Sequence, residues 1–540
     1  MSGHSIRARA PRGDARAAPR IERDPDVLAS FAEDAAHFPG GFAAGVAVPS
    51  SEAEVAALIR SAPAILPIGA QSSLTGGATP NGEIVLSTAR LNCILDRGAF
   101  GADSVRVGAG VTLVDLDAAL ARSGRCYPPV PTFTGAFAGG IVATNAAGAA
   151  TFKYGTTRDW VKALTVVLAS GDVLDVERGR TVADRDGNFE IVLSGHAVRI
   201  RVPRYRMPHV PKLSAGYFAA PGMDLIDLFV GSEGTLGVIT AVTFRVLPAR
   251  PAMCLAFVPF DDARAALAFV RRMRDAAQET WRARDPRGLD VAAIEHMDAR
   301  CLAVLREDGV DRELGVAIPE TAAMALLVTL ELPAGMTSEH SFDEIGRARE
   351  PDAPVTPLVR FCRALDDARV LDRVEIAVPG DHAREQQLLA LREAVPAAVN
   401  ARVGRAKQQV DPRIAKTAAD MIVPFERLDE LLTIYDEEFR RRGLDAAVWG
   451  HISDGNLHPN VIPRSMADVE SGCDAIRAFG REVIRLGGSP LAEHGVGRNA
   501  VKQELLAELY GRDGIDEMRA VKRALDPDFK LAPGVLFERA

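Results

Sequence analysis

Two histidines flank an Asp-Gly pair in the segment WGHISDGNLHPN, residues 449–460, of a chain that has only ten histidines. An Asp-Gly pair between two short runs is typical of a β-hairpin with a two-residue turn, because a type I′ turn needs positive φ at both central positions. With Asp454 and Gly455 in the turn, His451 faces His458 directly across the strands. Directly opposed residues have Cβ atoms about 4.5 to 5.5 Å apart on one face, and two imidazoles at that separation can bind one metal ion.

Asn460 follows His458 by two residues and is expected on the same face of its strand. Taken alone, the hairpin favours a simpler interpretation, in which the two histidines are hydrogen-bonded in a core or at the surface and bind no metal. A metal site therefore needs support from other parts of the chain.

Length and composition indicate a large globular protein. With 540 residues the chain exceeds one ordinary hydrophobic core, so two or three domains are expected. Hydrophobic residues make up 47%, charged residues 25%, and the net charge is -8, which argues against a nucleic-acid-binding protein. Small solutes are better candidates for partners.

The six cysteines contain no C-x-x-C pair. Their spacing disfavours an iron–sulfur cluster, a zinc ribbon and a disulfide framework, and it fits a reducing compartment. No run approaches about 18 apolar residues, and the first residues contain no apolar signal region. We therefore expect a cytoplasmic protein that is at most peripheral to the inner face of a membrane.

The pattern of helices and strands predicts an α+β protein in four parts. Residues 1–26 are rich in arginine and are expected to form a disordered arm. Residues 27–248 alternate short β-branched runs with glycine turns, and residues 249–445 combine long helical patterns with strands. Residues 446–540 carry the hairpin and are expected to pack back on the first domain. A loose, proline-rich insertion is expected near residues 334–358.

Two glycine-rich segments lie in the first domain, PIGAQSSLTGG at residues 67–77 and PTFTGAFAGGIVATNAAGAATFKYG at residues 131–155. Both consist mainly of small residues, so their backbones can approach a ligand closely. Successive N–H groups in such loops bind anions, here most simply a pyrophosphate. Turn formation and tight packing explain either segment equally well when it is considered alone. The motif G-x-x-x-x-G-K-[ST] is absent, which counts against an NTPase.

The order of several motifs resembles a known family. PIGAQSSLTGG is followed by GGIVATNAAG, by KYGTTRDWVKALTVVLASGDVL and by GSEGTLGVIT at residues 231–240. This series resembles the PCMH-type FAD-binding domain of the vanillyl-alcohol oxidase superfamily. WGHISDGNLHPN, AEHGVGR and LDPDFKLAPGVLF resemble the FAD-linked oxidase C-terminal module of D-2-hydroxyacid dehydrogenases, the group of D-lactate dehydrogenases and glycolate oxidase flavoprotein subunits. The resemblance covers most of the chain from Phe42 onward.

The resemblance implies an FAD site built from the glycine-rich segments. Residues 69–75 would surround the diphosphate, and Glu233, Gly234 and Ile239 would lie near the adenosine end. The flavin and its phosphates would be lined by Gly139, Gly140, Thr144, Asn145, Gly148 and Gly155. The implied FAD-binding residues are Pro67, Gly69, Ala70, Gln71, Ser72, Ser73, Thr75, Gly76, Pro131, Thr132, Gly135, Gly139, Gly140, Thr144, Asn145, Gly148, Gly155, Glu233, Gly234 and Ile239. Some relatives attach FAD through a histidine in the first segment. Residues 67–77 contain none, so dissociable, non-covalent FAD is expected.

The resemblance also implies a divalent metal, zinc or manganese, with His451, His458 and Glu493 as its ligands. Two neutral imidazoles and a carboxylate suit these ions and leave coordination positions open for a chelating substrate. A 2-hydroxy acid is such a chelator, and coordination would lower the pKa of its hydroxyl group.

Three further residues are implied to act on the substrate. His494 would be the general base, because imidazole titrates near neutral pH. Arg392 would bind the substrate carboxylate, although a solvent-exposed helical arginine is an equally good interpretation of the sequence alone. Asn460 would donate a hydrogen bond from the hairpin, and hydride would pass from the substrate Cα to flavin N5.

The chain departs from the family pattern at two positions. Pro396 stands where relatives often carry a hydroxyl residue, four positions after the arginine, and Ala532 stands where they carry an asparagine. These departures leave the identity of the 2-hydroxy acid open.

The leading hypothesis is an FAD-dependent, metal-assisted dehydrogenase that oxidises a D-2-hydroxy acid, such as D-lactate, to the 2-oxo acid. The alternatives are a glycolate oxidase-type flavoprotein subunit, a zinc-dependent hydrolase without flavin, and a non-catalytic flavin-binding or assembly subunit. Expected partners are the small 2-hydroxy acid and an electron acceptor, which could be a quinone, a cytochrome or an electron-transfer flavoprotein. Nucleic acid is not expected as a partner, and the sequence leaves open whether the chain forms a homodimer.

Overall fold

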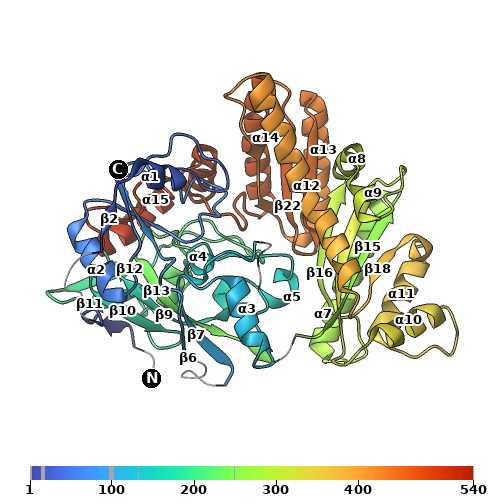
Figure 1. Ribbon diagram of the computed structural model, residues 1–540, viewed down its shortest axis with the longest axis horizontal. Coiled ribbons are helices and arrows are strands. Elements are labelled where there is room, and N and C mark those ends of the chain that lie inside the picture. Colours follow the sequence, from blue (N-terminus) through green and yellow to red (C-terminus); the bar gives the residue numbers. More distant parts are fainter. Residues whose placement is uncertain are drawn as a thin grey trace. The chain divides into compact units, whose positions relative to one another are not determined.

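The chain divides into two compact units, each a mixture of helices and sheets (Figure 1). The computed structural model describes residues 3–13, 19–96, 102–129, 131, 133–248 and 250–538. Unit 1 consists of Met1–Gly148, Gly155–Ala249 and Ser489–Ala540, and unit 2 consists of Ala149–Tyr154 and Arg250–Gly488. The predicted α+β class is confirmed.

Unit 1 contains several small sheets and short helices. The described strands form a sheet in the order β2 (Ile21–Glu22), β3 (Gly45–Ala47), β5 (Ile84–Ser87), β4 (Ile65–Ile68), and another in the order β10 (Val173–Glu177), β9 (Val161–Val167), β13 (Val238–Arg245), β7 (Ser104–Gly108), β6 (Ile94–Asp96). Smaller sheets pair β1 (Ser5–Arg7) with β11 (Asn188–Val192) and β12 (Ala197–Arg201), and β8 (Arg125–Cys126) with β14 (Leu247–Pro248). The helices include α1 (Pro25–Ser30), α2 (Glu52–Ser61), α3 (Leu113–Ala121), α4 (Ala138–Ala143), α6 (Ile226–Phe229) and α15 (Ala500–Leu525).

The central strands of unit 1 explain why its glycine-rich segments are held firmly. β13 is buried along its length from Val238 to Phe244, as expected for an apolar run that is covered on both faces. The amide of Gly139, at the start of α4, donates to the carbonyl of Ala109, which directly follows β7. The second glycine-rich segment is thereby attached to the core of the unit.

Unit 2 is built on one large sheet whose described strand pairs are antiparallel. Among the described residues its strands run in the order β18 (Glu375–Ala377), β15 (Ala252–Phe260), β17 (Met324–Leu332), β16 (Val291–Asp298), β21 (Ala446–His451), β22 (Asn456–Val461), β19 (Thr417–Ala418), and β20 (Met421–Ile422) also pairs with β22. The helices of this unit are α5 (Thr151–Tyr154), α7 (Ala263–Ala283), α8 (Ala299–Asp308), α9 (Val310–Leu314), α10 (Ser338–Arg347), α11 (Pro357–Asp367), α12 (His382–Gln409), α13 (Leu428–Arg442) and α14 (Met466–Arg485).

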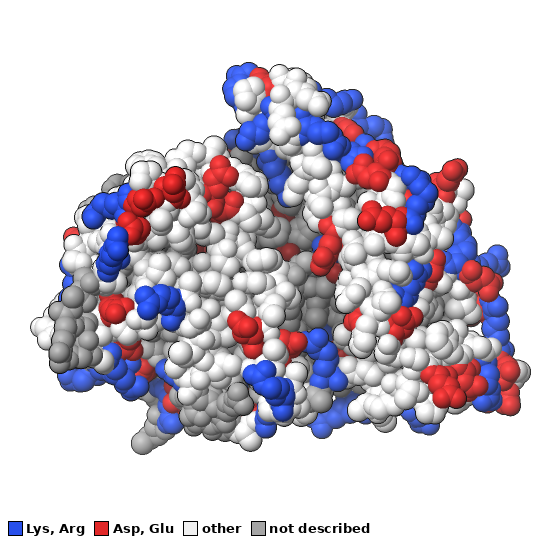
Figure 2. Space-filling view, in the orientation of Figure 1, with Lys and Arg blue, Asp and Glu red and all other residues white. Residues whose placement is uncertain are grey.

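The core of unit 2 lies between the sheet and its helices. Residues of α8 and α12 pack with Trp449 of β21 in one apolar cluster. α13 and α14 (orange in Figure 1) pack through Phe439 and Phe479, whose rings are 5.1 Å apart. No helix in the described ranges is long and apolar enough to cross a membrane. On the face shown in Figure 2, acidic and basic side chains are interspersed.

The expected domain boundary after residue 445 is wrong. The hairpin and α14 belong to unit 2, and only Ser489–Ala540 returns to unit 1. The physical reason is the sheet: β21 pairs with β16, so its backbone groups are satisfied within unit 2.

The predicted two-residue turn of the hairpin is also wrong. Its loop is the short 3-10 helix Ile452–Asp454 followed by Gly455, and His451 pairs with Asn456 while Trp449 pairs with His458. The two histidines are therefore diagonal partners, not directly opposed ones. They still share a face of the sheet. Asn456, the partner of His451, is two residues from His458, and side chains two residues apart on a strand point to the same face.

Two other segments are more ordered than the sequence predicts. The described part of the expected disordered arm contains β1, which pairs with β11, and Arg9, which forms ion pairs with Glu52 and Asp175. The expected loose insertion at residues 334–358 contains α10, whose start is capped by the Thr337 side chain.

The C-terminal segment of unit 1 is fastened by a buried lysine. The Lys522 Nζ atom donates to the carbonyl oxygens of Thr235 (2.9 Å) and Leu531 (2.8 Å) and to Asp526 Oδ2 (3.0 Å). Leu531 in turn lies beside Ile65 of β4, the strand that leads into the first glycine-rich segment. All three ammonium hydrogens are used, so this contact ties three chain segments together.

We expect Lys522→Met to lower the free energy of unfolding by about 3–5 kcal/mol, because Asp526 is left buried without its counter-ion. Denaturant unfolding followed by circular dichroism measures this change. Lys162→Met is the control, since the pair of Lys162 with Asp103 is partly exposed and such pairs contribute about 0–1 kcal/mol. Equal losses in the two variants would contradict the assignment.

Candidate active site

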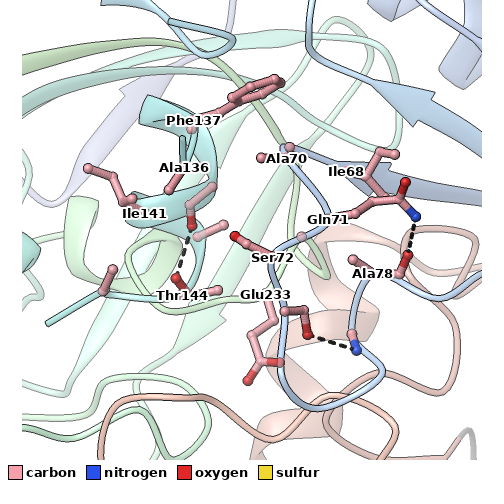
Figure 3. Close-up of a pocket in the computed structure, with 18 of the residues that line it drawn as sticks. Ile68, Ala70, Gln71, Ser72, Ala78, Ala136, Phe137, Ile141, Thr144 and Glu233 are labelled. Carbon is pink, nitrogen blue, oxygen red and sulfur yellow. Dashed lines mark hydrogen bonds between the residues drawn. The ribbon is translucent and has the colours of Figure 1, made fainter. Parts of the chain in front are cut away.

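A cavity of about 300 Å³ lies in unit 1, between the two glycine-rich segments (Figure 3). Its wall also includes residues 233–239, which lead into β13, and Glu493 and His494 of the C-terminal segment. Four stretches that are far apart in sequence therefore meet at one site.

Most of the residues that the sequence analysis assigns to FAD line this cavity. They are Pro67, Gly69, Ala70, Gln71, Ser72, Ser73, Thr75, Pro131, Gly139, Gly140, Thr144, Glu233, Gly234 and Ile239. The sequence analysis missed further wall residues, among them Ile68, Phe133, Ala136, Phe137, Ile141 and Val238. These are apolar, and nothing in their spacing distinguishes them from core residues.

Other assigned residues are not part of the wall. They are Gly76, Gly135, Asn145, Gly148 and Gly155. Asn145, for example, has φ 49° and accepts from the Arg158 amide through Oδ1. Thr132 lies outside the described residues.

Gln71 shows how a polar wall residue is used by the fold itself. Its Nε2 donates to the carbonyl oxygens of Phe31, Glu33 and Ala78, and the bond to Ala78 is drawn in Figure 3. Its φ of 50° is unusual for a residue with a side chain. The amide nitrogen therefore holds the loop in shape, and the backbone faces the cavity.

Gly139 and Gly140 are adjacent but have different roles. A Cβ atom on Gly139 would lie 2.7 Å from the Cβ of Ala109, so this glycine is required by packing. A Cβ atom on Gly140 would meet nothing within 4 Å, and Gly140 lines the cavity. The glycine at position 140 therefore leaves room for a ligand.

Glu233 holds the C-terminal segment against the cavity. Its two carboxylate oxygens accept from the backbone amides of Val496 and Gly497, each at 2.8 Å. Burial raises the pKa of the Glu233 carboxyl to about 7, against the opposing effect of these two hydrogen bonds. The sequence analysis places Glu233 near adenosine, whereas its carboxylate is used to position the loop that carries Glu493 and His494.

Lys212 is a buried charge that the sequence analysis missed. Its Nζ atom donates to Glu493 Oε2 at 3.0 Å, and its side chain has no exposed surface. The other oxygen of the carboxylate, Oε1, lies 3.6 Å from His494 Nε2. Lys212 and Glu493 are 281 residues apart, so no local signal links them.

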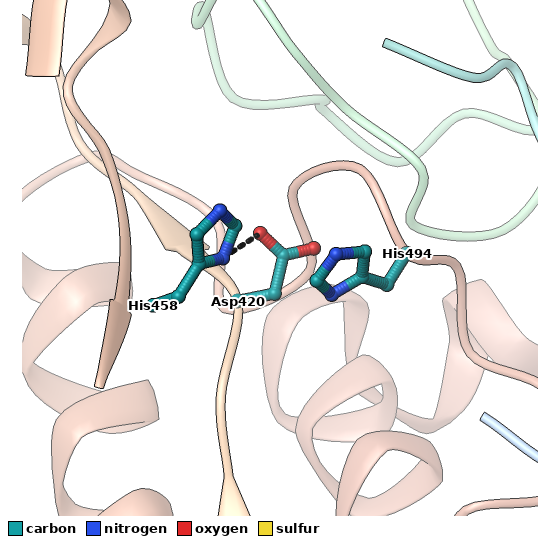
Figure 4. Close-up of side chains that lie close together, drawn as sticks. All are labelled: Asp420, His458 and His494. Carbon is teal, nitrogen blue, oxygen red and sulfur yellow. Dashed lines mark ion pairs between the residues drawn. The ribbon is translucent and has the colours of Figure 1, made fainter. Parts of the chain in front are cut away.

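In unit 2, one face of the large sheet carries the hairpin histidines. The rings of His451 and His458 have centroids 5.6 Å apart and are perpendicular, and both residues are buried. His458 Nδ1 lies 3.4 Å from Asp420 Oδ1 (Figure 4). Asp420 has no place in any motif considered in the sequence, so it was missed.

Asn460 lies on the same strand as His458 and has one satisfied and one unsatisfied polar atom. Its Nδ2 donates to the His458 carbonyl at 2.9 Å, and its buried Oδ1 has no hydrogen-bond partner among the described residues. The His458 carbonyl oxygen can only accept a hydrogen bond, so the Asn460 atom that faces it must be the amide nitrogen and not Oδ1. The amide nitrogen carries two N–H groups and this bond uses one of them, so the expectation that Asn460 donates to the substrate stays a prediction.

Arg392 is buried on α12 and donates through Nε to Glu295 of β16. The alternative interpretation as a solvent-exposed arginine is therefore wrong. Because the guanidinium is paired with a carboxylate, the pair brings no net charge to this part of the unit.

Comparisons with known proteins identify the family. The family model described as FAD linked oxidases, C-terminal domain, matches residues 252–536, and the model described as FAD binding domain matches residues 43–177. The chain belongs to the FAD-linked oxidase family. FAD is therefore its cofactor, and the glycine-rich wall of the cavity, where a Cβ atom on Gly140 would meet nothing within 4 Å, leaves room for part of this cofactor.

Several relatives extend along nearly the whole chain. A D-2-hydroxyglutarate dehydrogenase from Xanthomonas citri pv. viticola is 31% identical, with 91% of this chain and 89% of the relative covered. A D-lactate dehydrogenase from Anaerostipes hadrus is 28% identical, with 90% and 87% covered. The solved structure of 4-ethylphenol oxidase from Gulosibacter chungangensis has a TM-score of 0.63 at 18% identity, with 96% of this chain and 94% of that chain covered. At that identity the last similarity concerns the fold alone.

We expect Gly140→Leu to reduce FAD affinity at least about tenfold, equivalent to 1.4 kcal/mol, because the new side chain occupies the cavity. FAD titration of the cofactor-free protein by fluorescence quenching measures the affinity. Gly346→Leu is a matched control, since Gly346 is also helical and a Cβ there also meets open space, outside the cavity. Unchanged FAD affinity in Gly140→Leu would show that FAD binds elsewhere.

We expect Glu233→Gln to flatten the pH dependence of stability in the FAD-free protein. The pKa of the Glu233 carboxyl is about 7 in the folded protein, against an ordinary value of 4.5. The contribution of its protonation to the free energy of unfolding is therefore fully present below pH 4.5 and is lost as the pH rises to about 7. Denaturant unfolding at several pH values measures the slope. The exposed variant Glu320→Gln should keep the slope of the parent protein, and an unchanged slope in Glu233→Gln would contradict the raised pKa.

Proposed function

We propose that the protein is a dehydrogenase that oxidises a D-2-hydroxy acid to the 2-oxo acid with dissociable FAD and a divalent metal ion. The observation that carries this proposal is the arrangement of unit 1. The glycine-rich wall of the cavity, within a chain of the FAD-linked oxidase family, supports FAD binding there, and the same wall contains an acid and a potential base, Glu493 and His494. When bound, FAD supplies the electron acceptor for the hydride of the substrate.

The substrate class is supported by the relatives. The D-2-hydroxyglutarate and D-lactate dehydrogenases both carry names of D-2-hydroxy acid enzymes, and the similarity extends over about nine-tenths of this chain. Glycolate, the smallest 2-hydroxy acid, is the alternative suggested by the similarity to the glycolate oxidase subunit GlcD of Bacillus subtilis, at 27% identity.

His494 is the proposed general base. It lies in the wall of the cavity, its side chain is 29% exposed, and the neighbouring Glu493 carboxylate stabilises the protonated imidazole. An imidazole in this position can accept the proton of the substrate hydroxyl near neutral pH.

The metal part of the proposal rests on the donors of unit 2. His451 and His458 present two buried imidazoles on one face, and the unsatisfied Oδ1 of Asn460 belongs to the same strand as His458. A bound zinc or manganese ion would supply Lewis-acid polarisation of the substrate hydroxyl. Glu493, the third ligand implied by the resemblance, belongs to unit 1 and stays a prediction.

Asn460 and Arg392 would orient the substrate. The Asn460 Oδ1 atom would accept a hydrogen bond, from either a hydroxyl group or a water molecule. The Nη atoms of Arg392 would bind the substrate carboxylate while Nε remains on Glu295.

Anaerobic mixing with 2-hydroxy acids tests the proposal. We expect D-lactate or a larger D-acid to bleach the flavin absorbance, L-acids to leave it unchanged, and chelator treatment to slow the bleaching. His494→Ala should slow it by about 10²–10⁴, the usual contribution of a general base. The exposed His340→Ala on α10 is the control. A protein that is not bleached by any D-2-hydroxy acid would overturn the proposal.

A further inference from the structure

Asp420 lies opposite His458 in the large sheet of unit 2. β19 pairs Ala418 with Asn460, and β20 pairs Met421 with Leu457. Both pairs belong to one register, so the residues between them continue it, and Asp420 is opposite His458. The ladder is interrupted there because Pro459 has no N–H group, although the Ala419 amide still donates to the Pro459 carbonyl at 3.0 Å.

The carboxylate of Asp420 is fixed in place. Asp420 is 1% exposed and His458 is 5% exposed. Asp420 Oδ1 accepts from Asn456 Nδ2 at 2.9 Å and lies 3.4 Å from His458 Nδ1. Asn456 Nδ2 also donates to the Met421 carbonyl, which fixes the orientation of its amide. The oxygen that faces the imidazole therefore cannot turn away without breaking a buried hydrogen bond.

This arrangement selects one tautomer of the imidazole. Nδ1 lies 3.4 Å from a carboxylate oxygen, at ion-pair distance and without the geometry of a hydrogen bond to it. The negative charge of that oxygen attracts a proton on Nδ1 and repels a lone pair there. The proton therefore stays on Nδ1, and Nε2 keeps the lone pair that a metal ion needs. Carboxylates that hold a metal-binding histidine in this way raise its basicity and fix its ring.

We propose that Asp420 is a positioning residue that holds His458 in the Nδ1–H tautomer and so prepares Nε2 as a metal ligand. The inference rests on the proposed function for the presence of the metal, but the tautomer is a property of the metal-free protein.

Two measurements on the full chain with bound FAD test the inference. Long-range ¹H–¹⁵N spectra of histidine-labelled, metal-free protein report the tautomer, and the signal of His458 is assigned by its loss in His458→Gln. Competition with a chromogenic chelator reports the zinc affinity. We expect the Nδ1–H tautomer in the parent protein, a shift toward Nε2–H in Asp420→Ala, and zinc affinity lowered about 10–100-fold in Asp420→Ala and Asp420→Asn.

Asp298→Asn is the matched control. Asp298 is another carboxylate of the same sheet, and it accepts from the amides of Cys301 (2.7 Å) and Val448 (2.8 Å). This variant should leave both the tautomer and zinc affinity unchanged, and Asp420→Glu should restore part of the affinity. An Nε2–H tautomer in the parent protein, or unchanged zinc affinity in both neutral variants, would overturn the inference. A parent protein that binds no zinc would overturn the metal part of the proposed function instead, and the tautomer would then decide the role of Asp420.

Discussion

A single buried carboxylate holds the end of the chain against the cofactor cavity. Glu233 belongs to the segment before β13, and it binds the backbone of Val496 and Gly497, more than 260 residues later. The contact is close enough that a Cβ atom on Gly495 would lie 2.8 Å from the carboxylate. Glu493 and His494 reach the wall of the cavity because this loop is fixed, so the chemistry proposed for unit 1 depends on this interaction.

Three residues in or beside the wall of the same cavity have an unusual backbone conformation. Gln71, Asn145 and Glu233 all have φ near 50°, a region that residues with side chains rarely occupy. Each such residue costs about 1–3 kcal/mol and persists only where the surroundings require it. Here the requirement is visible, since the side chain of each residue is held by at least two hydrogen bonds. The strain allows the backbone to turn its polar groups toward a ligand while the side chains hold the walls.

Unit 2 follows a different principle, in which buried polar side chains are paired between neighbouring strands and helices. Arg392 is paired with Glu295, and His458 lies against Asp420. A buried ion that loses its partner is costly, so these pairs also keep the side chains in defined orientations. The orientation of each functional group in this unit is therefore set by a neighbouring strand or helix.

The sequence by itself determined the fold class, the two glycine-rich segments, the main helices and the family. These properties depend on local residue patterns and on the order of motifs, and both can be recognised in the sequence without knowledge of the fold. It also pointed to most of the residues in the cavity wall, because glycine, serine and threonine at close spacing allow the backbone to approach a ligand.

Only the tertiary structure decided which groups meet. The hairpin register depended on a loop of four residues instead of two, and this difference changed the residue opposite His458. The domain boundary depended on the pairing of β21 with β16, and the roles of Lys212 and Asp420 depended on contacts with residues far away in sequence. The reason is physical: a buried charge is defined by its partner, and no local pattern encodes a partner that the chain brings close only when it folds.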